Sequence, residues 1–278
     1  MTEPNRQSGE NEERIIEIEI ERLRPFKEHP FQVKDDKEMF LLQESIEKYG
    51  ILNPLIVRPV PDGYYEIISG HRRKHAAEKL GYRKVPVIIR VLSEDDSILS
   101  MVDSNLHRER ISYSEKAFAY KLKNDVLKRK SGRKKSQVDH KTPRKRSIDI
   151  ISEDCGDSPK QVQRYISLTK LIPEMLQKLD DEIISFCPAV EIAALKENEQ
   201  RELLKAMDYA QAIPSLSQAQ RIKQLSKEKQ LSLEKMEEIM ELCPDISKVT
   251  VERILTNLVK SGYIAKVGAG LSTGYVRI

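Results

Sequence analysis

The residues best suited to binding chemistry lie in one short stretch, Gly70-His71-Arg72-Arg73. Each arginine offers a planar fork of N–H donors that fits a phosphate or a carboxylate. A glycine lets a ligand approach the backbone closely, and the first N–H groups of a helix favour negative charge. If a helix begins after Gly70, these residues form an anion site. The alternative is a pair of solvated arginines on an exposed first turn, because short glycine-plus-basic motifs often occur by chance.

The residues around this stretch predict the strand and the helix that such a site requires. Residues 64–69 alternate in polarity and are rich in aromatic and branched types, as in a β-strand. After them the period changes, and Ala76, Ala77 and Leu80 recur at helical spacing. Residues 70–73 are therefore predicted to lie at a strand-to-helix junction.

The remaining N-terminal residues also alternate between strand and helix patterns. Residues 1–14 are polar and are predicted to be disordered. Beyond them, strands are predicted at residues 15–20, 55–60 and 84–91, and helices at residues 35–49 and after the N-cap Ser93. This alternation predicts one compact α/β domain over residues 15–106.

Composition limits the class of protein. The chain has 278 residues, 39% hydrophobic residues and no tryptophan, which favours a soluble, helix-rich protein of two or three domains. No apolar run approaches the roughly 20 residues of a membrane span, so we expect no membrane partner and a cytoplasmic location without a signal peptide. Cys155, Cys187 and Cys243 have no metal-ligand spacing and are expected to be thiols.

Positive charge is concentrated in a basic linker, residues 128–146. It holds ten Lys or Arg residues and one Asp, whereas the whole chain has a net charge of only +4. Such a block on an otherwise acidic chain is typical of a protein that binds a phosphate backbone, although a solvated flexible loop would have the same composition. The candidate DNA contacts here are Arg133, Lys134, Lys135, Arg144, Lys145 and Arg146.

A helix-turn-helix is predicted next to the basic linker. A helix at residues 147–155 breaks at Gly156, and a second helix restarts with Ser158 as N-cap and proline at its first position. The start of such a second helix is where base edges are read. The predicted DNA contacts are Ser158, Lys160, Gln161, Gln163 and Arg164. Any pair of packed helices could give the same pattern.

The predicted fold class is α+β, with an all-α region and a different C-terminal part following the α/β domain. Residues 107–230 form the helical DNA-binding domain. Residues 231–278 combine helices with a glycine-tipped hairpin and are predicted to be a small winged-helix-like module. A minimal dimerisation or packing module is an equally good interpretation of the last part.

Together these motifs resemble the ParB family of partition proteins. Residues 50–58 are similar to its first motif, and residues 70–76 to its arginine-rich nucleotide motif. Residues 105–108 are similar to its third motif, and residues 147–170 to its helix-turn-helix. The resemblance covers residues 17–231 and is strongest to the versions of plasmids and integrative elements of Gram-positive bacteria.

The resemblance implies a homodimeric clamp that binds a double-stranded DNA site, closes on CTP and Mg²⁺, and is moved by a ParA-type ATPase. It would be associated with the nucleoid. It implies that Gly70, Arg72 and Arg73 hold the triphosphate, that Asn105 helps to place Mg²⁺, and that Gly50 and Asn53 lie near base and ribose. His71 and Arg108 belong to the same predicted nucleotide-binding set.

Three residues depart from the family pattern. His71 and His75 stand where the family usually has Glu and Arg, and Ser104 stands where the hydrolysing members have Glu. Because that carboxylate would activate water, we expect at most weak CTP hydrolysis and assign no catalytic residue.

Other functions remain open. A transcriptional regulator of a mobile element would have the same domains. A sulfiredoxin-like enzyme needs a cysteine where this chain has Gly70, so that reaction is excluded. A nuclease or phosphotransferase would need a metal, for which Glu66, Asp103 and Glu109 are the available carboxylates.

Overall fold

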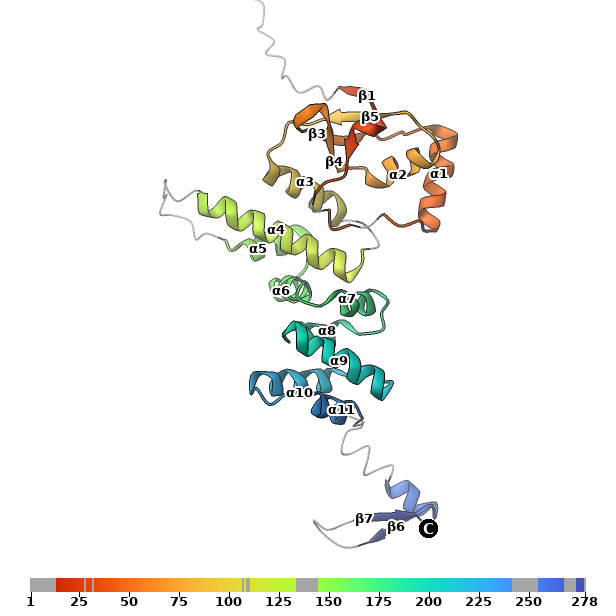
Figure 1. Ribbon diagram of the computed structural model, residues 1–278, viewed down its shortest axis with the longest axis vertical. Coiled ribbons are helices and arrows are strands. Elements are labelled where there is room, and N and C mark those ends of the chain that lie inside the picture. Colours follow the sequence, from red (N-terminus) through yellow and green to blue (C-terminus); the bar gives the residue numbers. More distant parts are fainter. Residues whose placement is uncertain are drawn as a thin grey trace, which may run out of the picture. The chain divides into compact units, whose positions relative to one another are not determined.

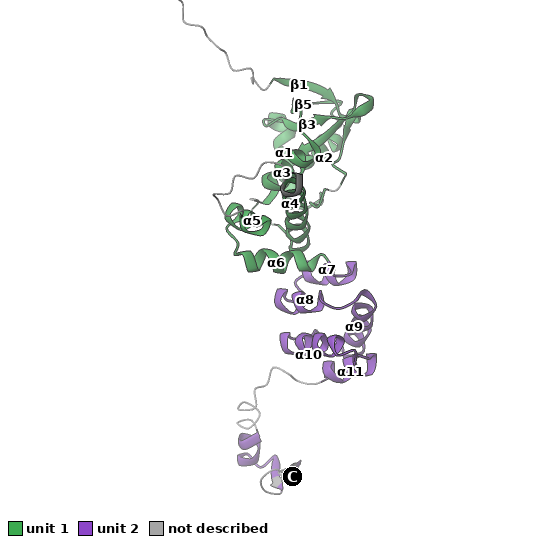
Figure 2. Ribbon diagram, turned by 90° about the vertical axis from the view of Figure 1, so that its left-hand side faces the viewer, with its two compact units in different colours: residues 1–169 green, residues 170–278 purple. Residues whose placement is uncertain are grey.

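The computed structural model describes residues 14–27, 29–31, 33–106, 108, 111–133, 145–241, 255–267 and 274–277. The chain divides into two compact units, residues 1–169 and residues 170–278 (Figure 2). The predicted tail 1–14 lies outside the described residues except for Arg14.

The first unit is built on a five-stranded sheet with the order β1-β5-β3-β4-β2 (Figure 1). The β5–β3 and β4–β2 pairs are parallel, and the β1–β5 and β3–β4 pairs are antiparallel. The strands are β1 (Ile15–Glu19), β2 (Leu23–Arg24), β3 (Leu55–Pro59), β4 (Tyr65–Ser69) and β5 (Lys84–Ile89). The sequence patterns predicted four of these strands; β2 has only two residues, too few to show a period.

Each face of the sheet packs against different helices, because side chains alternate along a strand. Ile67 of β4 lies in the core shared with α2 (His71–Lys79), on which α1 (Lys37–Tyr49) packs. The next residue, Ile68, lies in the core formed with α3 (Glu94–Leu106) and α4 (Tyr113–Arg133).

The helix-turn-helix follows in the same unit. α5 (Ser147–Cys155) ends at Gly156, whose φ of 74° is the left-handed conformation that glycine adopts without strain. α6 (Pro159–Leu168) begins at Ser158, whose hydroxyl accepts a hydrogen bond from the N–H of Gln161 at 3.2 Å. Val162 of α6 packs with Tyr120 of α4, so α4 is shared between the sheet and the helix-turn-helix.

Among its described residues, the second unit contains a short helical segment at residues 255–260. Its longer helices and its hairpin strands have the following bounds. They are α7 (Pro173–Asp180), α8 (Phe186–Ile192), α9 (Glu197–Ala210), α10 (Leu216–Lys227), α11 (Leu233–Glu241), β6 (Ile264–Val267) and β7 (Gly274–Arg277). The α+β fold class is confirmed. No helix in the described part of the chain is long and apolar enough to cross a bilayer.

The C-terminal part contains the predicted hairpin. β6 and β7 pair in antiparallel register, and residues 255–260 before them are helical. The boundary predicted at residue 231 precedes α11, which packs on α9 and α10 and buries Met236 and Met240. The winged-helix interpretation stays a prediction, because residues 242–254 lie outside the described residues.

Candidate functional site

Gly70 forms the junction between β4 and α2, as predicted. It is the N-cap of α2 with φ 107° and ψ 21°, in the left-handed region. A Cβ at this position would lie 2.8 Å from Cγ of Leu55 and 3.2 Å from Nη2 of Arg73. Glycine is therefore required here both by the backbone conformation and by the lack of space.

Arg72 is held by the residue that caps the neighbouring helix. Its Nη2 and Nη1 donate to the two carboxylate oxygens of Asp36 at 2.8 and 3.3 Å, and Glu38 lies 3.7 Å away. Asp36 also accepts a hydrogen bond from the N–H of Met39 at 2.8 Å, which caps α1. The pKa of Asp36 is held below its usual range mainly by the hydrogen bond from Arg72 and secondly by the one from this N–H. An incoming anion would have to compete with Asp36 for the Arg72 fork.

The Asp36→Asn variant is expected to bind inorganic triphosphate up to about fivefold more tightly, because a partly exposed ion pair contributes at most about 1 kcal/mol. Asparagine still caps α1, so the helix is kept. Titration calorimetry measures the change. The matched control is Asp35→Asn, because Asp35 contacts His75 at 3.0 Å and Lys79 at 2.6 Å instead of Arg72. An equal gain in both variants would contradict direct competition.

Arg73 and Arg108 complete a group of three guanidinium groups. Arg73 donates through Nη1 to the carbonyls of Asn53 and Pro54, the latter at 2.8 Å, and so fixes the loop that carries Asn53. The pKa of Arg73 is lowered mainly by burial and secondly by the charge of Arg108. The pKa of Arg108 is lowered mainly by burial and secondly by the charge of Arg72. A neighbouring cation thus destabilises the charged form of Arg73 and of Arg108, the latter partly stabilised by Glu115 and Glu38, and a bound anion would relieve this repulsion.

We use the name arginine site for Gly70, Arg72, Arg73 and Arg108. His71, at the first position of α2, lies beneath it with only 8% of its surface exposed. Its ring contacts that of His29 in a tilted arrangement at a centroid distance of 3.7 Å, and the Nε2 atoms of both rings are buried without a hydrogen-bond partner. Burial, and then the neighbours His29, Arg108 and Lys74, lower the pKa of His71 to about 3. His71 is therefore neutral at pH 7, and its contact with a nucleotide stays a prediction.

Asn105 and Gly50, the other predicted nucleotide residues, lie at helix ends. Asn105 is buried in the last turn of α3, where its amide donates to the carbonyl of Met101 at 2.7 Å and to the Ser104 hydroxyl at 3.2 Å. Gly50 caps α1 with φ 72°. Neither residue is placed against a ligand here, so their predicted roles stay predictions.

The structure gives no support to a protein-only metal site. In the part of the chain that it describes, no three His, Cys, Asp or Glu side chains are placed to hold a metal ion. Glu66 pairs with Arg58 at 2.5 Å and Asp103 with Lys123 at 2.6 Å, and Glu109 lies outside the described residues. A Mg²⁺ ion at the arginine site would need phosphate oxygens among its ligands, as Mg²⁺ commonly has.

The predicted DNA contacts are brought together only at the start of α6. Ser158, Lys160 and Gln163 are exposed there, and Gln161 and Arg164 are half-buried. Lys145 and Arg146 pair with acidic residues of α5, Glu153 at 2.7 Å and Asp149 at 3.0 Å. Lys134, Lys135 and Arg144 lie outside the described residues, as does the side chain of Arg133.

Sequence reasoning missed the polar face of α4 that contacts the helix-turn-helix. Lys116 and Tyr120 both bind Asp157, at 2.8 and 2.7 Å, and Lys123 binds Asp154 at 2.8 Å. The i, i+4, i+7 spacing of the three α4 residues places them on one side of the helix and was the available signal. Their acidic partners could not be assigned without the fold.

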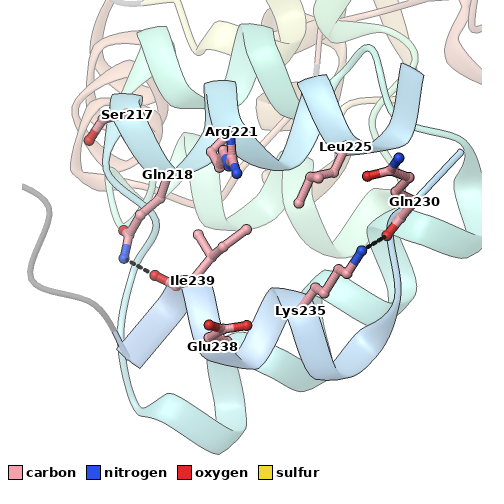
Figure 3. Close-up of a pocket in the computed structure, with 8 residues that line it drawn as sticks. All are labelled: Ser217, Gln218, Arg221, Leu225, Gln230, Lys235, Glu238 and Ile239. Carbon is pink, nitrogen blue, oxygen red and sulfur yellow. Dashed lines mark hydrogen bonds between the residues drawn. The ribbon is translucent and has the colours of Figure 1, made fainter. Parts of the chain in front are cut away.

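A cavity of about 380 Å³ lies between α10 and α11 in the second unit (Figure 3). Leu225 and Ile239 form apolar wall, and Arg221, Lys235 and Glu238 add charges of both signs. None of the predicted site residues lines it.

The family comparison agrees with the motifs of the first unit. The model of the ParB N-terminal domain matches residues 4–106, a range that contains Gly70, Arg72 and Arg73. The chain contains a ParB N-terminal domain. The ParB N-terminal domain therefore contains the whole arginine site except Arg108, which follows it by two residues.

Two curated relatives are named nucleoid occlusion proteins. That of Bacillus mycoides (strain KBAB4) is 36% identical over 136 residues, 46% of this chain and 47% of the relative, so the chain spans about half of that protein. That of Lysinibacillus sphaericus (strain C3-41) is 27% identical over 91% of this chain and 82% of the relative.

A solved structure is also similar to this chain. It is the C-terminally truncated chromosome-partitioning protein ParB from Caulobacter crescentus complexed with CTP-γ-S. It is 28% identical, covers 65% of this chain and 92% of its own, and has a TM-score of 0.32.

Proposed function

We propose that this chain is a sequence-specific DNA-binding protein of chromosome or plasmid partition, and that its arginine site binds the triphosphate of CTP together with Mg²⁺. The observation that carries the proposal is the group formed by Arg72, Arg73 and Arg108 at the N-terminus of α2. Two half-buried arginines at a helix N-terminus, with the exposed Arg108 from the chain after α3 beside them, suit a ligand with several negative charges.

The remaining features of the proposal come from the motifs. The chain acts as a homodimeric clamp in association with the nucleoid, with a ParA-type ATPase as partner and the helix-turn-helix as its DNA reader. Nucleoid occlusion is the alternative role on DNA, because the two curated relatives carry that name. Clustered binding sites beside a ParA-type gene favour partition, and sites dispersed over the chromosome favour nucleoid occlusion.

Binding without efficient hydrolysis is part of the proposal. The Ser104 hydroxyl donates to the carbonyl of Met101 at 2.9 Å, and a serine hydroxyl at this position is a poor base for water. The arginine site then acts as a switch that is set by ligand occupancy.

The test uses the full chain, CTP with Mg²⁺, and a duplex selected by the protein from a random-sequence library. We expect micromolar CTP binding by calorimetry, weaker binding of ATP, and little phosphate release. Absence of binding to CTP, ATP and inorganic triphosphate would remove the nucleotide half of the proposal. Rapid phosphate release with the selected duplex would overturn the prediction of weak hydrolysis.

A further inference from the structure

Lys123 is a buried lysine that joins three helices. It lies on α4 with 3% of its side chain exposed. Its ammonium group is 2.6 Å from a carboxylate oxygen of Asp103 on α3 and 2.8 Å from one of Asp154 on α5. Both carboxylates are about half exposed, so the lysine is the buried partner of the group.

This arrangement is poorly explained by stability alone. Burial works to lower the pKa of Lys123, but the two carboxylates outweigh it and raise the pKa above its ordinary value, so the ammonium group is charged at neutral pH. A buried ion pair can often be replaced by apolar side chains without loss of stability, because desolvation offsets the attraction. What the lysine provides is a fixed arrangement of α3, α4 and α5.

The same contacts form a continuous connection within the first unit. The backbone N–H of Arg108 donates to the carbonyl of Asn105 at 3.1 Å, and Asn105 shares the last turns of α3 with Asp103. Lys123 then joins Asp103 to Asp154 of α5. Figure 1 shows α4 beside both α3 and α5, in agreement with the cores that they share.

Two further contacts extend the connection to the start of α6. Lys116 and Tyr120, on the same side of α4 as Lys123, bind Asp157 in the turn between α5 and α6. The pKa of Tyr120 is raised mainly by burial and secondly by this carboxylate. The phenol therefore keeps its proton and stays a hydrogen-bond donor. A shift of α3 relative to α4 would therefore disturb the residues that place the helix-turn-helix.

We infer that Lys123 is a positioning residue that transmits occupancy of the arginine site to the helix-turn-helix, through Asp103 on α3 and Asp154 on α5. This inference rests on the proposed function, because it needs both ligands. It adds a named residue to a reciprocal coupling: by linkage, bound nucleotide changes DNA affinity by the same factor as bound DNA changes nucleotide affinity.

The experiment measures the coupling ratio, which is the Kd for the selected duplex without CTP and Mg²⁺ divided by the Kd with them. The variant is Lys123→Met, which keeps the length of the side chain and removes its charge. In the wild type we expect CTP and Mg²⁺ to change the Kd for the duplex by about fivefold or more. In Lys123→Met we expect them to change it by less than about twofold. Lys121→Met, an exposed lysine on the same helix, is the matched control and keeps the wild-type ratio.

A second variant separates coupling from a general effect on folding. Asp154→Asn removes one partner of Lys123, and in the Lys123→Met background it should change the coupling ratio no further, because the two residues act as a unit. Thermal unfolding of each variant verifies the fold.

The outcomes are distinct. If Lys123→Met is folded and keeps the wild-type coupling ratio, or if both ligands bind the wild type with a ratio of one, the inference is wrong and the proposed function stands. If the wild type binds neither CTP nor the selected duplex, the proposed function fails and the inference falls with it.

Discussion

The Arg72→Ala, Arg73→Ala double variant binds CTP and inorganic triphosphate at least about 100-fold more weakly than the wild type, or without a measurable signal. A hydrogen bond to a charged group contributes about 1.5–3 kcal/mol, and about 1.4 kcal/mol corresponds to a factor of ten in affinity. Loss of one such bond from each arginine is enough to reach this factor. Calorimetry with Mg²⁺ measures it directly.

The control for this result must account for the second role of Arg73. Its guanidinium holds the carbonyls of Asn53 and Pro54, so its loss also loosens the loop beside the arginine site. Arg72→Ala alone leaves that loop in place and is expected to cause about half of the loss in binding free energy. Arg83→Ala removes an exposed arginine beyond α2 and should leave the affinity unchanged. A folded double variant with wild-type affinity would show that the anion binds elsewhere.

The Gln163→Ala, Arg164→Ala variant loses preference for the selected duplex while keeping its affinity for random DNA. Both residues lie on α6 after its capped start, where recognition helices contact base edges. Each lost base contact costs about 1–3 kcal/mol, so the two changes together should reduce the specificity ratio by about 30-fold or more. Competition binding of the two duplexes at one fixed salt concentration measures this ratio.

A phosphate-contact variant gives the opposite pattern and serves as the comparison. Neutralising Arg133, Lys134 and Lys135 should weaken the binding of both duplexes alike. It should also reduce the slope of log Kd against log salt concentration by about 0.9 per lost phosphate contact. If the α6 variant also weakens the binding of both duplexes equally, Gln163 and Arg164 contact the DNA backbone and do not read bases.

Local features of the fold were predictable from the sequence because their signals lie within a few residues. The Ser158 cap and the strand-to-helix junction at Gly70 both appear in the structure. The junction that carries Arg72 and Arg73 was therefore placed correctly on β4 and α2.

The partners of the site residues could not be predicted, because they depend on contacts between distant parts of the chain. Arg72 meets Asp36 across 36 positions, and Lys123 meets Asp154 across 31. The contact between the rings of His29 and His71 was missed for the same reason. Periodicity indicates which face of a helix is buried, but it does not identify the residue on the other side.

The Asp36–Arg72 pair has a consequence for which anions the protein can accept in the cell. Asp36 pairs with Arg72 and Glu38 lies 3.7 Å from it, so a ligand with a single charge would only replace one ion pair with another and gain little. A ligand with three or four charges would also offset the charges of Arg73 and Arg108, and Glu115 and Glu38 offset that of Arg108 only in part. We therefore expect the pair to act as a charge filter, which would favour a polyphosphate over chloride or inorganic phosphate at the arginine site.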